Sequence, residues 1–163
     1  MSKKTLLFGI GNYGRADDAL GWIFLDEIKE YLPENFDMEY RYQLQVEDAE
    51  LASHYDVVYF IDAHVQSFEA GFSCEACMAK SVNSYTSHEL EPETILYLTE
   101  SIYDKKPESY VLGITGIDYE LKVGLSKIAR QNLSESVNYF TENILKNDIK
   151  FCNCQNKKLN EVK

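Results

Sequence analysis

The sequence is short of positive charge and of long hydrophobic runs. It has 16 Lys and Arg against 27 Asp and Glu, which gives a formal net charge of -11. Because so acidic a chain repels phosphate backbones and carries no basic patch, we expect no nucleic-acid partner. The longest apolar runs, such as residues 57–61, are much too short to span a bilayer, so we expect no membrane contact.

The chain also has only 3 Pro and 8 Gly, and its composition is that of an ordinary globular protein. The length of 163 residues predicts one domain with a sizeable core. Residues 1–8 have a charged start but only a short apolar run before the first glycine. They therefore predict a first strand and not a signal peptide, and we expect a cytoplasmic location.

The four cysteines form two close pairs, Cys74 with Cys77 and Cys152 with Cys154. Four thiolates suit a zinc site, and a single pair suits a redox centre. Residues 72–79, however, predict a strand, on which residues three apart point to opposite faces. The second pair lies in a polar tail. We therefore expect inert thiols.

Strand patterns alternate with helical patterns along the chain. The predicted strands cover residues 4–10, 38–43, 56–61, 72–79 and 109–115. The predicted helices cover residues 20–31, 47–53, a segment beginning at Pro92, and 120–145, where Leu121 and Ile128 are expected on the buried side. This alternation predicts an α/β fold: a three-layer single domain whose mostly parallel central sheet has helices on both faces. The domain is expected over residues 1–148, with a mobile polar tail at 149–163, and we expect a monomer.

The turn after the first strand contains G-x-G-x-x-G at Gly9, Gly11 and Gly14, the spacing of dinucleotide-binding turns. Two features argue against a nucleotide. Asp17 and Asp18 follow directly, and their charges would repel a pyrophosphate. The second strand ends at Gln43-Leu44-Gln45, without the acidic residue that binds the ribose.

A cation fits this turn better than an anion. Ligands of open α/β sheets bind beyond the carboxyl ends of the strands. Asp18 follows the first strand, and Asp62 ends an almost wholly apolar third strand, where an unpaired carboxylate is costly. Together with a histidine they form an oxygen–oxygen–nitrogen set that suits nickel or zinc and leaves positions open for water or substrate. The alternative is that Asp17 only caps the first helix and Asp18 is a surface acid.

The three histidines have different expected roles. His88 lies in the loop before Pro92 and is the favoured metal ligand. His64 follows Asp62 by two residues and shares its face, so it is expected to support the site or lie at its rim. His54 precedes the third strand, at the opposite end of the sheet, and is expected on the surface or in packing.

An ordered set of motifs resembles the maturation proteases of nickel–iron hydrogenases over nearly the whole chain, to about residue 148. The set is G-I-G-N-x-x-x-x-D-D-x-x-G at residues 9–21, Asp62-Ala63 with Gly71, and Ser87-His88-x-Leu90. Such proteins remove a short C-terminal peptide from the hydrogenase large-subunit precursor after nickel has been inserted into it.

The resemblance also implies roles for individual residues. Asp18, Asp62 and His88 would recognise nickel carried by the precursor, with zinc as a substitute in isolation. Asn12 and Asp17 would support them, with Asp17 as a cap that orients Asp18. Many relatives have Gly-Gly-Thr where this chain has Gln43-Leu44-Gln45, so the resemblance assigns partner recognition to Gln43 and Gln45.

The sequence contains no convincing nucleophile–base pair, so a metal-assisted hydrolysis is the consistent mechanism. Asp18 or Asp62 would accept the proton of the attacking water. Whether the metal is catalytic or only anchors the peptide stays open at this point. Two other functions stay open as well: a nickel-dependent chaperone that binds the precursor without cutting it, and a general α/β metallopeptidase.

Overall fold

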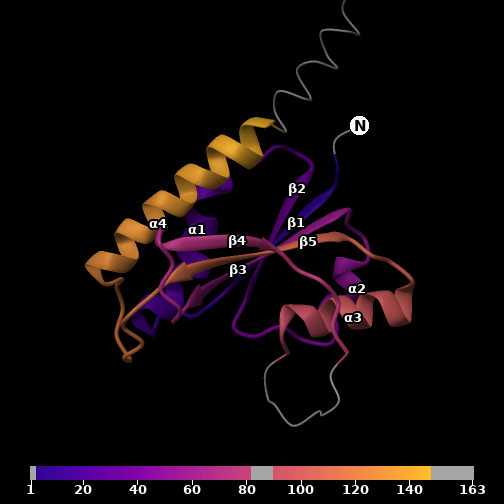
Figure 1. Ribbon diagram of the computed structural model, residues 1–163, viewed down its shortest axis with the longest axis horizontal. Helices are drawn as coiled ribbons and strands as arrows, with labels where there is room; N and C mark the ends of the chain where they lie inside the picture. Colours follow the sequence, from indigo (N-terminus) through magenta and orange to yellow (C-terminus); the bar gives the residue numbers. More distant parts are fainter. Residues whose placement is uncertain (1–2, 82–89, 148–163) are drawn as a thin grey trace, which may run out of the picture.

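The computed structural model describes residues 3–81 and 90–147, which build a five-stranded sheet in the order β2-β1-β3-β5-β4 (Figure 1). The strands are β1 (Thr5–Ile10), β2 (Phe36–Arg41), β3 (Val57–His64), β4 (Phe72–Ala76) and β5 (Glu108–Thr115). β1, β2, β3 and β5 are parallel, and β4 runs antiparallel to β5. The predicted mostly parallel sheet is confirmed.

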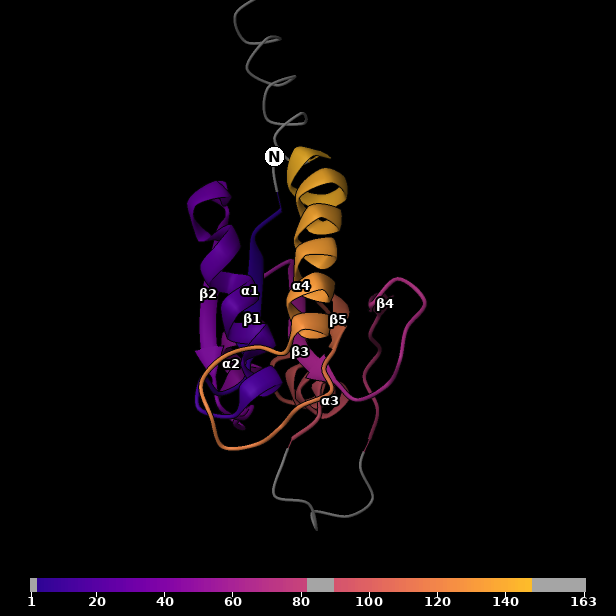
Figure 2. The same ribbon diagram turned by 90° about the vertical axis from the view of Figure 1, so that its left-hand side faces the viewer.

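Helices cover both faces of the sheet, which confirms the three-layer prediction (Figures 1 and 2). α1 (Leu20–Ile28) and α4 (Lys127–Phe140) pack on one face, and α2 (Asp48–Ala52) and α3 (Pro92–Tyr103) pack together on the other. Short helical turns extend two of them: η1 (Ala16–Ala19) and η2 (Lys29–Tyr31) flank α1, and η3 (Thr141–Leu145) continues α4. No helix of the described residues is long and apolar enough to cross a membrane.

The apolar strand β3 is central to the core because its alternating side chains supply both layers. Tyr59 and Ile61 pack with α1 and α4, where the Phe24 and Phe140 rings meet edge-on at 5.4 Å. Phe60 packs on the opposite face and stacks on Phe8 at 5.4 Å. A strand buried on both faces is expected to be apolar without interruption, as β3 is from Val57 to Ile61.

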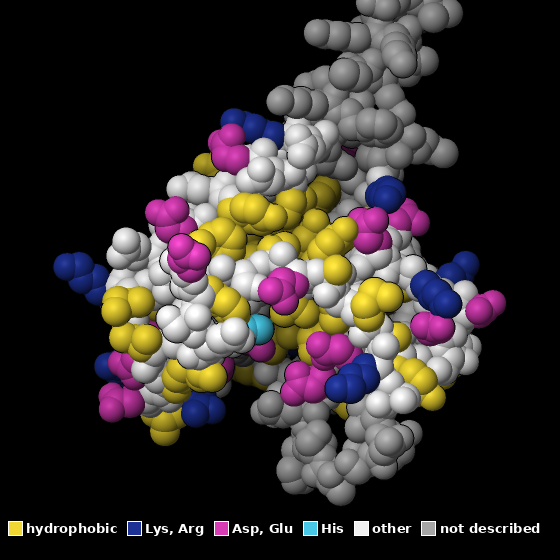
Figure 3. Space-filling model, in the orientation of Figure 1, with side chains coloured by type: hydrophobic (Ala, Val, Ile, Leu, Met, Phe, Trp, Pro, Cys, Tyr) yellow, Lys and Arg dark blue, Asp and Glu magenta, His cyan; other side chains and the backbone are white. Residues whose placement is uncertain are grey.

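Cys74 in the edge strand β4 and Cys77, directly after this strand, point to opposite faces of the sheet as predicted. Cys74 packs with the core under α4, whereas Cys77 belongs to the core on the α3 face. Both are free thiols. Beside Cys74, the rings of Phe72 and Tyr139 lie 5.3 Å apart, and Figure 3 shows hydrophobic side chains gathered where α4 meets this edge. Cys152, Cys154 and the expected mobile tail lie outside the described residues.

The last helix begins later than the sequence predicts. Residues 116–126 form an irregular segment, and α4 starts at Lys127 with Ser126 as its cap, whose Oγ accepts from the amide of Ala129 at 3.1 Å. Leu121, predicted to be buried, is 85% exposed, and Ile128 is half exposed. The prediction of a helix from residue 120 was wrong because contacts with a distant part of the chain, described below, outweigh the local apolar spacing.

Two glycines of the first turn serve packing. Gly9 in β1 faces Gly21 in α1, so that a Cβ on Gly9 would lie 2.7 Å from the Gly21 carbonyl oxygen. A Cβ on Gly21 would lie 2.5 Å from the Ile61 carbonyl oxygen and would also press on that of Ile10. The glycine spacing therefore lets α1 lie directly on β1 and β3, in agreement with the argument against a nucleotide.

We expect Gly21→Ala to lower the free energy of unfolding by about 1–3 kcal/mol, because the added methyl must push α1 away from two strand carbonyls. Gly14→Ala is the matched control, since its Cβ would meet only Asn12 Oδ1 at 3.3 Å. Urea denaturation of both variants measures the effect. Equal stability of the two would contradict the close contact.

Candidate functional site

A polar cavity of about 280 Å³ lies at the carboxyl ends of β1 and β3, where the strand order switches direction. Its lining includes Asn12, Asp18, Gln43 and Asp62. Four residues predicted from separate parts of the sequence thus meet in one place, at the position that the α/β fold predicts for a ligand.

Asp18 is positioned by a compact turn between β1 and α1. The Asn12 amide donates to the Asp18 carbonyl at 3.1 Å, and the Asn12 side chain accepts from the Gly14 amide at 2.8 Å. Ala16 has a φ of 49°, in the left-handed region that side chains other than glycine rarely adopt. Such a conformation, which costs on the order of 1 kcal/mol, persists only where the surroundings fix it. Asn12 thus supports the turn that carries Asp18.

Asp62 lies within β3, because this strand continues to His64 and not only to the predicted end at residue 61. It pairs in register with Gly113 of β5, and its Oδ1 accepts from the amide of Ala63 at 2.8 Å. The sheet backbone therefore fixes where this carboxylate enters the cavity.

Asp17 does not cap its own helix, contrary to the prediction. It is fully buried, and its carboxylate reaches a segment about a hundred residues away. Oδ2 accepts from the amides of Ile117 and Asp118 at 2.9 and 3.0 Å and from the Ser126 hydroxyl at 2.7 Å, while Oδ1 accepts from the Ser126 amide at 2.7 Å. Burial alone would raise the pKa of Asp17, but these hydrogen bonds outweigh it and lower the pKa below the ordinary 3.8.

Three residues of the cavity lining with polar side chains were not predicted from the sequence: Arg15, Tyr42 and Glu91. Arg15 adds a positively charged side chain to the lining, and Glu91, at the start of α3, adds a third acidic side chain. Tyr42 follows β2 directly. The rule that polar residues after strands gather at one edge could have found Tyr42 and Arg15, whereas Glu91 follows no strand.

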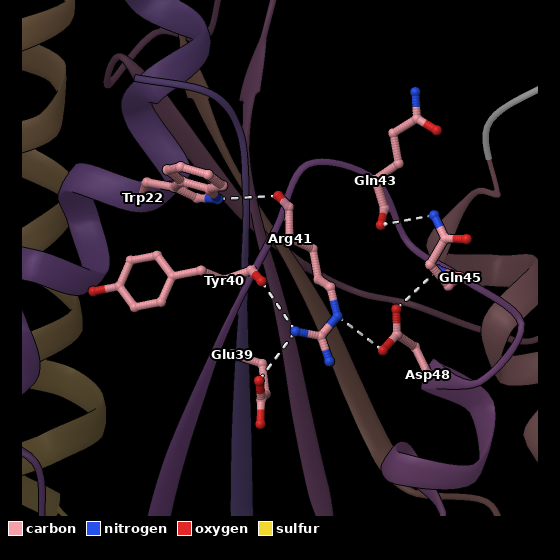
Figure 4. A network of polar contacts seen from close by, with 7 residues as sticks. All are labelled: Trp22, Glu39, Tyr40, Arg41, Gln43, Gln45 and Asp48. Atoms are coloured by element: carbon pink, nitrogen blue, oxygen red, sulfur yellow. Dashed lines mark hydrogen bonds and ion pairs between the residues drawn. The ribbon is translucent and has the colours of Figure 1, made fainter. Parts of the chain in front are cut away.

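The segment after β2 is held rigidly beside the cavity (Figure 4). Arg41 Nε donates to Asp48 Oδ1 at 3.0 Å, and the Gln45 amide donates to Asp48 Oδ2 at 2.8 Å. The Trp22 indole donates to the Arg41 carbonyl at 3.0 Å. Gln43 lines the cavity and Gln45 does not, so the structure separates the two residues to which partner recognition was assigned.

His64 faces a different cavity from Asp62, although both belong to β3. It lines a hollow with Cys77 and Glu93, and its ring packs against Gly113, on which a Cβ would lie 2.5 Å from Nδ1. Burial lowers the pKa of His64, and the charge of Glu93 opposes this shift. His64 thus lies beside the carboxylate cavity and not within its lining.

The third predicted ligand, His88, lies outside the described residues. Within residues 3–81 and 90–147, no three His, Cys, Asp or Glu side chains are arranged to hold a metal ion. Of the three acidic residues in the described lining, Asp18 and Asp62 are the two predicted ligands, and their carboxylates are hard oxygen donors suited to a divalent cation.

The fold is similar to that of hydrogenase maturation proteases. The HycI NiFe hydrogenase maturation protease of Thermococcus kodakarensis superposes with a TM-score of 0.70 at 21% identity, over 88% of this chain and 94% of its own. The hydrogenase maturating endopeptidase HybD of E. coli gives 0.69 at 15% identity, over 88% and 93%. A hydrogenase 2 maturation peptidase from a Thaumarchaeota archaeon gives 0.63 at 20%, over 86% and 97%. No protein-family model and no curated protein matches the sequence. At these identities the likeness establishes the fold.

We expect Asp17→Asn to lower the free energy of unfolding by about 2–4 kcal/mol, because the amide loses the charge and turns a donor toward other donors. The folded-state pKa of Asp17 lies below 3.8, so its stabilisation is complete above that pH and is lost as the pH falls through the folded-state pKa. The difference in the free energy of unfolding between Asp17→Asn and the wild type should therefore become smaller in acid.

Chemical denaturation at neutral pH and at successively lower pH measures this effect. Glu120→Gln, in the same segment, is the matched control, since its side chain is 79% exposed and its ion pair with Lys122 should contribute little. A difference between Asp17→Asn and the wild type that stays constant into acid would contradict the assignment of the effect to the ionised carboxylate.

Proposed function

We propose that the protein is an endopeptidase that removes a short C-terminal peptide from the large-subunit precursor of a nickel–iron hydrogenase after nickel insertion. One observation carries the proposal: Asp18, in the turn after β1, and Asp62, in β3, line one cavity at the switch point of a fold shared with hydrogenase maturation proteases.

The nickel is part of the substrate in this proposal. Asp18 and Asp62 would bind it from one side, with His88 as the proposed third ligand. Two carboxylates and an imidazole leave positions open for the precursor's own ligands and for the scissile carbonyl. Recognition of the metal then selects the loaded precursor, because an empty precursor lacks the shared ligand.

The chain's own residues provide the proton transfer. A water oxygen attacks the scissile carbonyl carbon while Asp18 or Asp62 accepts the water proton. The same carboxyl group then donates that proton to the leaving amide nitrogen as the carbon–nitrogen bond breaks. This returns the carboxylate and leaves a carboxylic acid and an amine. The bound metal would polarise the carbonyl or anchor the peptide beside the water.

The position of the segment after β2, which carries Gln43 and Gln45, supports a role in recognition of the precursor. Gln43 lines the cavity, and the Arg41–Asp48 pair fixes the segment that carries it. We propose that Gln43 contacts the precursor within the cavity. Gln45 is proposed to contact it only at the outer surface, since it lies outside the cavity lining.

Intact mass of a nickel-loaded large-subunit precursor, with and without the protein, tests the proposed activity. We expect loss of a C-terminal peptide from the loaded precursor and none from a metal-free one. Binding of the loaded precursor without a change in mass would favour the non-cleaving chaperone. Cleavage of unrelated unfolded proteins would favour a general metallopeptidase.

We expect Asp62→Asn to lower the cleavage rate by at least about 100-fold, because the amide neither accepts the proton nor binds the cation as a carboxylate does. The fold should persist, since Asp62 is only partly buried and lies near the carboxyl end of β3. Asp104→Asn, at the exposed end of α3, is the matched control and should cleave normally. Full activity of the Asp62 variant with a native circular dichroism spectrum would refute the site.

A further inference from the structure

Tyr119 carries an unexplained feature in the segment between β5 and α4. Among the described residues, its hydroxyl is the one buried side-chain polar atom that has no hydrogen-bond partner in the protein. A buried hydroxyl without a partner is destabilising, and native proteins hold few of them. Such a group therefore suggests a hydrogen-bond partner that comes within its reach only when the site is occupied.

The hydroxyl lies near Asp17, the residue that directly precedes the cavity carboxylate Asp18. A Cβ placed on Gly116 would lie 2.9 Å from the Tyr119 oxygen and 2.8 Å from Asp17 Cβ, so both crowd the same side of this glycine. Only glycine at residue 116 leaves room for the tyrosine ring in this place. The Asp17 hydrogen bonds to Ile117 and Asp118 fix the backbone immediately before Tyr119.

The pKa of Tyr119 responds to the charges of the cavity carboxylates. Burial, followed by the negative charges of Asp17, Asp18 and Asp62, raises the pKa of Tyr119 to about 12. Two of these three carboxylates, Asp18 and Asp62, line the cavity. A phenol in this setting keeps its proton at neutral pH and remains a hydrogen-bond donor near three negative charges.

We propose that Tyr119 is a positioning residue of this site, whose hydroxyl donates a hydrogen bond, directly or through one water, to the Asp18 or the Asp62 carboxylate once the precursor is bound. The inference rests on the proposed function and deepens it. Carboxylates that bind a cation are commonly oriented by such neighbouring donors, whose loss lowers activity although they do not touch the substrate. Tyr119 would hold that carboxylate in place while one of the two accepts the water proton.

The hydroxyl is not needed to hold its own segment. Asp17 ties residues 117, 118 and 126 through four hydrogen bonds, and the backbone amides of Ala16 and Asp17 donate to the carbonyls of Lys122 and Asp118, each at 2.8 Å. Removal of the single oxygen should therefore leave the segment in place. This separates a functional role of the hydroxyl from a structural role of the ring.

Tyr119→Phe tests the inference on the full chain with a nickel-loaded precursor as substrate. We expect kcat to fall about 10- to 100-fold with KM unchanged, because the variant still binds the precursor but orients that carboxylate less well. The melting temperature should stay the same or rise by a few degrees, since a buried hydroxyl without a protein partner has been removed. Tyr103→Phe, on an exposed part of α3, is the matched control and should change neither value.

Other outcomes would overturn the inference. A kcat within twofold of the wild type would mean that the hydroxyl has no role in the reaction. A loss of kcat together with a clear fall in melting temperature would mean a structural role, for example through a buried water. If the wild type itself does not cut the loaded precursor, the proposed function fails, and this result is distinct from a wild type that cuts beside an equally active Tyr119→Phe.

Discussion

The buried carboxylate of Asp17 is the contact on which the geometry of the site depends. It joins the turn after β1 to the segment after β5 with four hydrogen bonds, and backbone hydrogen bonds from Ala16 and Asp17 reinforce the junction. On one side of this junction stands Asp18, and on the other stand Tyr119 and the start of α4. A charged group is retained in the interior only where hydrogen bonds compensate its desolvation, as they do here.

Close backbone packing is the second constraint. Gly9 and Gly21 let α1 lie directly on β1 and β3, while Gly11 lies against the Asp18 carbonyl. The turn is therefore compact and fixes the position of Asp18. The left-handed backbone of Ala16 is consistent with a turn that its surroundings hold in place. A rigid turn of this kind would suit the proposed binding of Asp18 to a metal carried by another protein, because little ordering is needed on binding.

Much of this could be predicted from the sequence. The apolar run of β3 and the alternation of strands with helices were sufficient for the three-layer sheet, and the switch-point rule was sufficient to bring Asn12, Asp18 and Asp62 together. Gln43 was assigned by the family resemblance. The start of α4 could not be predicted, because the apolar spacing of residues 120–128 resembles a helix while tertiary hydrogen bonds to Asp17 decide otherwise. The hydrogen bonds of Asp17 to the segment after β5 could not be predicted either, because they join residues far apart in the sequence. Glu91 and Tyr119 follow no local pattern and become visible only when the chain is folded.

The central claim is that the cavity between β1 and β3 binds a divalent metal through Asp18 and Asp62. Anomalous diffraction from a crystal soaked in nickel tests it most directly, because the scattering locates the ion without any precursor. The account predicts a peak within coordination distance, about 2.0–2.2 Å, of a carboxylate oxygen from each residue. A peak only at another place, such as beside His64 and Cys77, with nothing at the two carboxylates, would contradict it.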